Sequence, residues 1–209
     1  MNINFRLFLF LTTAFFSFLT NATVGGPQAI QILGYDIADQ KIYYTLEYQD
    51  ETGRLPVLFY YSLQSKSSHK PVQVHSIYKS YNQNRSEKEY EKVLSNILSI
   101  QKRLKPLSSI NHSSTQIIIK NIEEKLGYFW TYHDDHLVNK ITSTYTVKNK
   151  THTSNRVTST SFQRPDLKIT QLFNVNDRSK QYQLAIVEYL GVPEETGYTK
   201  QDAILLKRN

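Results

Sequence analysis

The chain has 209 residues, of which 39% are hydrophobic and 21% charged, with 7 Gly, 6 Pro, no Cys and a formal net charge of +7. These proportions are typical of a globular protein and exclude collagen-like, low-complexity and disordered chains. Without Cys, the chain cannot hold a disulfide scaffold, a Cys-based zinc site, an iron–sulfur cluster or a thiol nucleophile. We find no nucleotide-binding fingerprint, nucleophile elbow or other catalytic motif.

The first 22 residues have the parts of a secretory signal peptide. Arg6 supplies a positive charge, residues 7–19 (LFLFLTTAFFSFL) form an apolar run, and small residues end at Ala22. The run is shorter than the about 20 residues that a membrane-spanning helix needs. We therefore expect residues 1–22 to be a signal peptide and the protein to be periplasmic or secreted, from a bacterium. An uncleaved N-terminal anchor is the alternative.

The first half of the remaining chain predicts a β-meander. Residues 41–48 alternate between apolar and polar side chains, which is the period of a half-buried strand. Neighbouring segments repeat this pattern between short polar turns, as expected of an antiparallel sheet. The predicted strands are residues 28–35, 41–48, 57–63 and 72–78.

The segment over residues 86–105 predicts an amphipathic α-helix. Its apolar residues recur at steps of three and four, which places them along one side of a helix. Ser86 and Glu89 have the spacing of a capping box, and Pro106 cannot continue the helix. We expect the apolar stripe to be buried against a sheet, although a helix that offers the stripe to a partner is the alternative. The stripe consists of Tyr90, Val93, Leu94, Ile97, Leu98 and Leu104.

The period of two returns after the helix. It predicts further strands over residues 115–122, 128–132, 141–148, 156–162, 167–175, 182–189 and 202–207. No stretch has the composition of a linker, so residues 23–209 are expected to form a single domain. The predicted fold class is α+β, a mainly antiparallel sheet system of about nine to eleven strands with one central helix packed on it.

One tetrapeptide is rich in metal-ligating side chains. His133, Asp134, Asp135 and His136 fall where a turn between two strands is expected. Two imidazoles and two carboxylates that converge in a turn can bind a divalent metal. The same residue types are also common in hairpin turns, where Asp bonds to its own backbone. No helical His-Glu-x-x-His motif accompanies them, so the residues stand as metal-site candidates only.

Basic residues concentrate between positions 138 and 165. Long cationic side chains beside aromatic rings suit a polyanion such as an anionic polysaccharide or lipid headgroups. A modest positive charge also simply keeps a protein soluble. Export makes genomic nucleic acid an improbable partner. The candidate polyanion-binding residues are Lys140, Lys148, Lys150, Arg156 and Arg164.

The 15 Tyr residues suggest a binding surface, because Tyr combines a flat apolar ring with a polar tip. Tyr43, Tyr60, Tyr189 and Tyr198 fall on the polar side of strands or in loops, so we expect them to be exposed. The sequence leads us to expect an exported, non-enzymatic module that binds a macromolecule or an envelope component, with no cofactor and no membrane span after signal removal. The alternative is a secreted metal-dependent hydrolase that uses residues 133–136.

Overall fold

The computed structural model describes residues 26–49, 53–64, 69–78, 87–128, 137–175, 181–191 and 198–209. The predicted signal peptide, Ser86 of the predicted capping box and the tetrapeptide 133–136 lie outside these ranges. Among the described residues, no helix is both long and apolar enough to cross a bilayer.

Two antiparallel sheets and one α-helix make up the described part of the chain. The first sheet has the order β1-β2-β3-β4. The second has the order β5-β10-β11-β12-β8-β7-β6, with β9 paired to β7 as a branch. The elements are β1 (Gln28–Asp36), β2 (Lys41–Tyr48), β3 (Val57–Ser62), β4 (Val72–Gln73), the 3₁₀ helix η2 (Ser76–Tyr78), α2 (Glu87–Gln101), β5 (Ser108–Ser109), β6 (Gln116–Tyr128), β7 (Leu137–Lys148), β8 (His152–Ser154), β9 (Val157–Phe162), β10 (Lys168–Asn174), β11 (Tyr182–Leu190) and β12 (Thr199–Arg208).

The fold class that the sequence predicts, α+β with mainly antiparallel strands and one helix, is confirmed for the described residues. The number of strands is twelve there, more than the nine to eleven expected. The sequence analysis missed the very short β5 and β8. Strands of two or three residues are too short to show a period.

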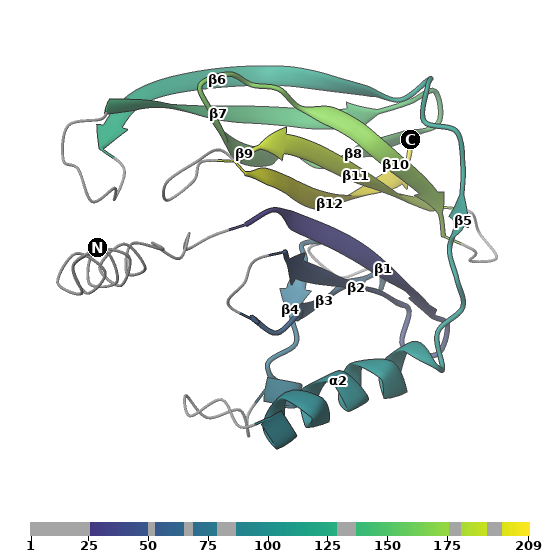
Figure 1. Cartoon of the computed structure of the whole chain (residues 1–209). Helices are drawn as coiled ribbons and strands as arrows, with labels where there is room; N and C mark the ends of the chain where they lie inside the picture. Colours follow the sequence, from purple (N-terminus) through teal and green to yellow (C-terminus); the bar gives the residue numbers. More distant parts are fainter. Residues whose placement is uncertain are drawn as a thin grey trace, which may run out of the picture.

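The elements stack in layers (Figure 1). The helix α2 covers one face of the β1–β4 sheet, and β10, β11 and β12 cover the other face. The second sheet curls over itself, so that β6 and β7 lie above β10–β12. Three apolar cores fill the spaces between these layers, and the first sheet is therefore buried on both faces.

This double burial overturns one expectation. Tyr43, predicted to be exposed on the polar side of β2, has only 5% of its surface exposed and packs under α2. Tyr60 packs against the same core and is partly buried. Tyr189 faces the interior of the curled sheet and is also buried, whereas Tyr198 is partly buried. A period of two identifies the two faces of a strand, but it does not say how many faces are covered.

The helix packs on the sheet as predicted, through Val93 and Ile97, which are buried. Tyr90, Leu94 and Leu104 are partly buried in the same core. Leu98, placed in the stripe by the sequence, is instead 55% exposed. It lies at the margin of the apolar arc, where the helix surface turns toward solvent.

The helix also ends earlier than predicted, at Gln101 rather than near residue 105. Lys105 exchanges two backbone hydrogen bonds with Tyr35, at 2.8 and 2.9 Å. This pairing draws the chain out of the helix and onto β1. Gly34 makes the close approach possible, because a Cβ atom there would lie 2.6 Å from the Lys105 carbonyl oxygen.

The predicted strand over residues 72–78 is wrong beyond Gln73. Residues 76–78 form η2 instead. The turn brings the Tyr78 hydroxyl to the backbone of the preceding segment, where it accepts from the Leu58 N–H (2.8 Å) and donates to the Pro56 carbonyl (2.6 Å). A side chain thus satisfies buried backbone groups that a longer β4 would have paired. β6 runs on to Tyr128, and the rest of the strand predicted over residues 128–132 lies outside the described residues.

Candidate functional site

The second sheet is split between β9 and β12. The strand β8 pairs with the end of β12, from His152 opposite Arg208 to Ser154 opposite Leu206. At Asn155 and Arg156 the chain turns away, and β9 forms its ladder with β7. No described strand therefore pairs with the 199–205 side of β12 that faces this split. At its other end β9 meets the end of β11, where Ser161 forms a bridge with Gly191.

A pocket of about 440 Å³ lies in this split, with the first sheet as its opposite wall. This volume is within the range of about 300–1,000 Å³ that is typical of small-molecule sites. Apolar and aromatic side chains from β1, β2 and β3 form one wall, and β12 and β9 form the others. The principal wall residues are Ile30, Tyr44, Leu46, Phe59, Tyr61, Val157, Ala203, Ile204 and Leu205.

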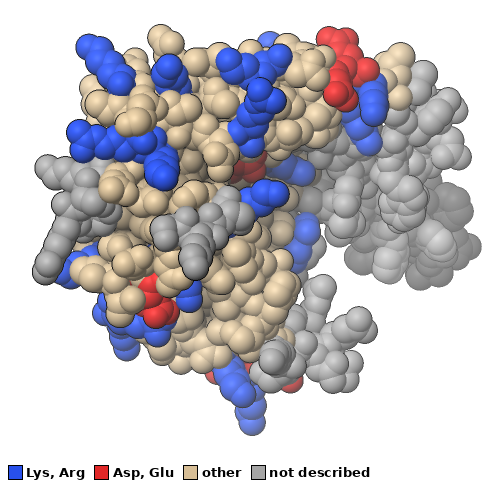
Figure 2. All heavy atoms as spheres, turned by 180° about the vertical axis from the view of Figure 1, so that it is seen from behind, with Lys and Arg blue, Asp and Glu red and all other residues tan. Residues whose placement is uncertain are grey.

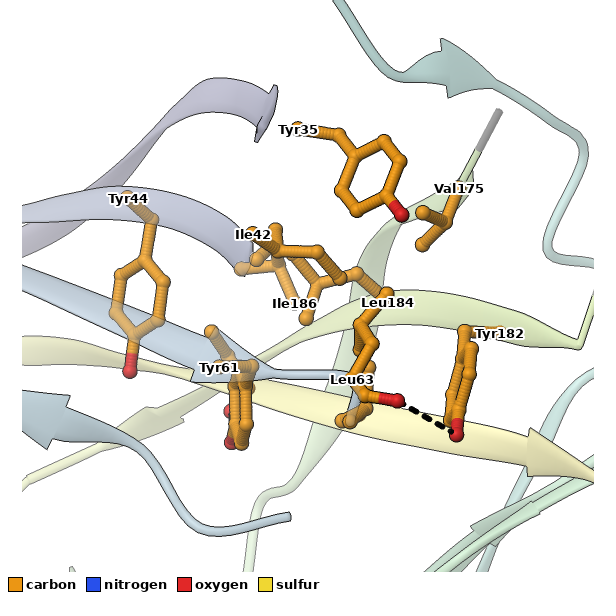
Figure 3. Packing of buried hydrophobic residues seen from close by; sticks show 11 residues of the cluster. Tyr35, Ile42, Tyr44, Tyr61, Leu63, Val175, Tyr182, Leu184 and Ile186 are labelled. Carbon is orange, nitrogen blue, oxygen red and sulfur yellow. Dashed lines mark hydrogen bonds between the residues drawn. The ribbon is translucent and has the colours of Figure 1, made fainter. Parts of the chain in front are cut away.

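Tyr44 lies at the centre of the aromatic wall. Its ring is stacked on Phe59, with centroids 5.5 Å apart, and tilted against Tyr61 at 6.0 Å. The residues come from neighbouring strands, with Tyr44 directly opposite Phe59 in the ladder between β2 and β3. Figure 3 shows the hydroxyl groups of Tyr44 and Tyr61 pointing in the same direction. Burial raises the pKa of both phenols far above the ordinary value, so both remain neutral.

The hydroxyl of Tyr61 substitutes for the missing strand beside β12. It donates a hydrogen bond to the Ala203 carbonyl oxygen, at 2.8 Å, and accepts one from the Leu205 backbone. Buried backbone groups must find partners, and here a side chain of the first sheet supplies them. The contact joins the two sheets and leaves the rest of the split open.

Asp202 is the acidic residue of the pocket lining. Its Oδ2 accepts a hydrogen bond from the Ser159 hydroxyl (2.6 Å), which is itself bonded to the Tyr145 hydroxyl (3.0 Å), and Tyr189 also bonds to the carboxyl group. We call Tyr145, Ser159, Tyr189 and Asp202 the Asp202 network. Loss of hydration raises the pKa of Asp202, and the hydrogen bonds offset this effect only in part. Asp202 forms no ion pair with any described residue.

The mouth of the pocket is basic. Lys70 and Arg156 line it, both are exposed, and neither forms an ion pair within the described ranges. His69 lies beside them, with its Nδ1 atom 3.3 Å from the Ser62 carbonyl oxygen. The site therefore combines an apolar body, a poorly hydrated carboxyl group and cationic side chains at the entrance.

The structure does not gather the five predicted polyanion-binding residues into one patch. Lys140 and Lys148 share the outer face of β7, but their separation of eight positions corresponds to about 26 Å of strand. Lys150 follows in the next turn, and Arg164 pairs with Asp166 at 3.5 Å. Arg156 alone belongs to the pocket. Figure 2 shows Lys and Arg side chains spread over one face, with acidic side chains fewer there.

The predicted metal site is not described, since residues 133–136 lie outside the structural ranges. Elsewhere in the described residues, no group of three His, Asp or Glu side chains is arranged to hold a metal ion. The metal site remains a prediction from the sequence.

The sequence analysis missed Asp202, Ser159 and Tyr61 as site residues. A signal for Asp202 was present, because its carboxylate shares a strand face with Ile204 and Leu206, which are buried. A charged group on the apolar side of an alternating strand is rarely found without a function or a partner. Comparison of the chain with protein-family models, with curated proteins and with solved structures gives no match.

Proposed function

We propose that this protein is an exported, non-enzymatic binding protein that takes up a small organic molecule in the pocket between its two sheets. The export part of the proposal is supported by the signal-peptide pattern of residues 1–22. The binding part is supported by the pocket itself, and it replaces the macromolecular partner favoured by the sequence with a small one.

The observation that carries the proposal is the character of the split between β9 and β12. An apolar pocket of about 440 Å³ with a few convergent polar groups is the usual form of a ligand site. The aromatic wall around Tyr44 supplies flat apolar surface, and the phenolic hydroxyls supply hydrogen bonds. Since Tyr61 is bonded across the split, the wall is already held in place before a ligand arrives.

The proposal can be tested with the neutral fluorescent probe N-phenyl-1-naphthylamine and the purified protein. We expect a saturable rise in fluorescence with one site per chain. Val157→Trp should weaken binding at least several-fold, because Val157 is a partly buried wall residue of the pocket and a larger side chain there narrows it.

Thr160→Trp is the matched control. Thr160 is exposed on the same strand and does not line the pocket. Probe binding should be unchanged in this variant. Absence of saturable binding to the wild-type protein, or equal binding to the two Trp variants, would contradict the proposed function.

A further inference from the structure

The charge of Asp202 is poorly balanced by its surroundings. The groups that bond to its carboxyl are the hydroxyls of Ser159 and Tyr189, which are neutral donors. Among the described residues, the cation that acts on it is Lys200, which lowers the pKa of Asp202 less than either hydrogen bond does. A carboxylate has about four acceptor positions, so two donors leave capacity for another partner.

The charge of Asp202 also acts on the neutral phenols around the site. The negative charge of Asp202 contributes to the raised pKa of Tyr44, Tyr61, Tyr145 and Tyr189. One carboxylate therefore influences phenols from both sheets. A poorly hydrated charge of this kind is costly for the folded protein unless a counter-charge joins it.

The aromatic wall of the same pocket suits a cation. Tyr44, Phe59 and Tyr61 present aromatic rings within the same pocket, and the faces of such rings attract organic ammonium groups. Asp202 lines this pocket and is only partly buried. A carboxylate and aromatic rings that line one pocket can together recognise an amine with an apolar body.

The cationic side chains at the mouth of the pocket act more weakly on a bound ligand than Asp202 does. Lys70 and Arg156 are exposed, and charges in water are screened over about 8 Å at physiological ionic strength. Asp202 is less hydrated, so its charge is screened less. Asp202, the less hydrated group, therefore governs which ligand charge the pocket selects.

We propose that the pocket selects an organic ammonium ion with an apolar body, whose charged nitrogen pairs with the Asp202 carboxylate. This inference rests on the proposed function, since it names the ligand class of the same pocket. An apolar anion held by Lys70 and Arg156 is the competing class.

The test is displacement of N-phenyl-1-naphthylamine by three molecules of nearly the same shape: 3-phenylpropylamine, 3-phenylpropanol and 3-phenylpropionate. We expect the amine to displace the probe at a concentration at least ten-fold lower than the alcohol or the acid. In Asp202→Asn the amine should lose this advantage, so that the amine and the alcohol displace the probe at about the same concentration. Asp166→Asn is the matched control, because Asp166 is exposed, pairs with Arg164 and does not line the pocket.

The outcomes separate the inference from the proposed function. The amine and the alcohol are compared within the same variant, so a general change of the pocket in Asp202→Asn affects both molecules alike. If the amine and the alcohol are equivalent, or Asp202→Asn leaves the amine unaffected, the inference is wrong while the pocket remains a binding site. If the acid binds best and Arg156→Gln weakens it, the inference is overturned in favour of an apolar anion. If the probe does not bind the wild-type protein, both the function and the inference fail.

Discussion

Two neighbouring residues of α2 provide a sharp test of how the helix is held. Ile97 is 6% exposed in the core under the helix, whereas Leu98 is 55% exposed. Ile97→Ala removes roughly three methyl or methylene groups, each worth about 0.8 kcal/mol when buried, and leaves a cavity, for a loss of about 2–5 kcal/mol. Leu98→Ala removes as many groups from a largely hydrated site, and Ala favours the helix slightly, so its cost should be about 0–1 kcal/mol.

Thermal unfolding followed by circular dichroism measures the difference. In a protein of this size each kcal/mol shifts the melting temperature by about 2–4 °C, so a loss of about 3 kcal/mol corresponds to about 6–12 °C. Lys92→Ala, on the exposed side of the helix, is the control and should melt like the wild type. Equal melting temperatures for Ile97→Ala and Leu98→Ala would refute the packing argument and favour a helix that offers its stripe to a partner.

Three other predictions follow from the site and the sequence. Tyr61→Phe should lower stability by about 1–3 kcal/mol, because it leaves the Ala203 carbonyl and the Leu205 N–H without their partner, whereas Tyr60→Phe should change little; urea titration compares the two. The raised pKa of Asp202 means that its carboxyl group holds a proton more tightly in the folded protein than in the unfolded chain. Ionisation of Asp202 therefore destabilises the fold, so Asp202→Asn should be more stable than wild type at neutral pH. The difference in stability between Asp202→Asn and the wild type should shrink as the pH falls through the raised pKa of Asp202 toward about 4. A difference that stays constant with pH would contradict a raised pKa for Asp202. The mature protein should begin near Thr23, and retention of Met1 in the intact mass of the exported protein would disprove signal cleavage.

Local patterns predicted the individual elements well where those elements are long. The strand Lys41–Tyr48 has the bounds that its alternation indicated, and the helix buries Val93 and Ile97 as its period required. These features depend on side chains of neighbouring residues, which the sequence displays directly. The short β8 and the turn at Ser76–Tyr78 depend on partners elsewhere, and the sequence did not reveal them.

The candidate site depends even more on partners that are distant in the sequence. The Ser159 hydroxyl and the Asp202 carboxyl that it bonds are 43 positions apart, and Tyr61 reaches Ala203 across 142 positions. No spacing rule connects residues at such separations, because the contact exists only after the second sheet has split and the first sheet has docked on it.

The sequence by itself determined the absence of cysteine chemistry, the alternation of the long strands and the amphipathic helix. Each of these follows from composition or from the geometry of a single element. The tertiary structure decided which faces are covered. It buries Tyr43 under the helix, and it places Asp202, which forms no ion pair among the described residues, in a pocket with an aromatic wall. Burial and solvation depend on what other parts of the chain lie nearby, so only the packing of the layers could set them.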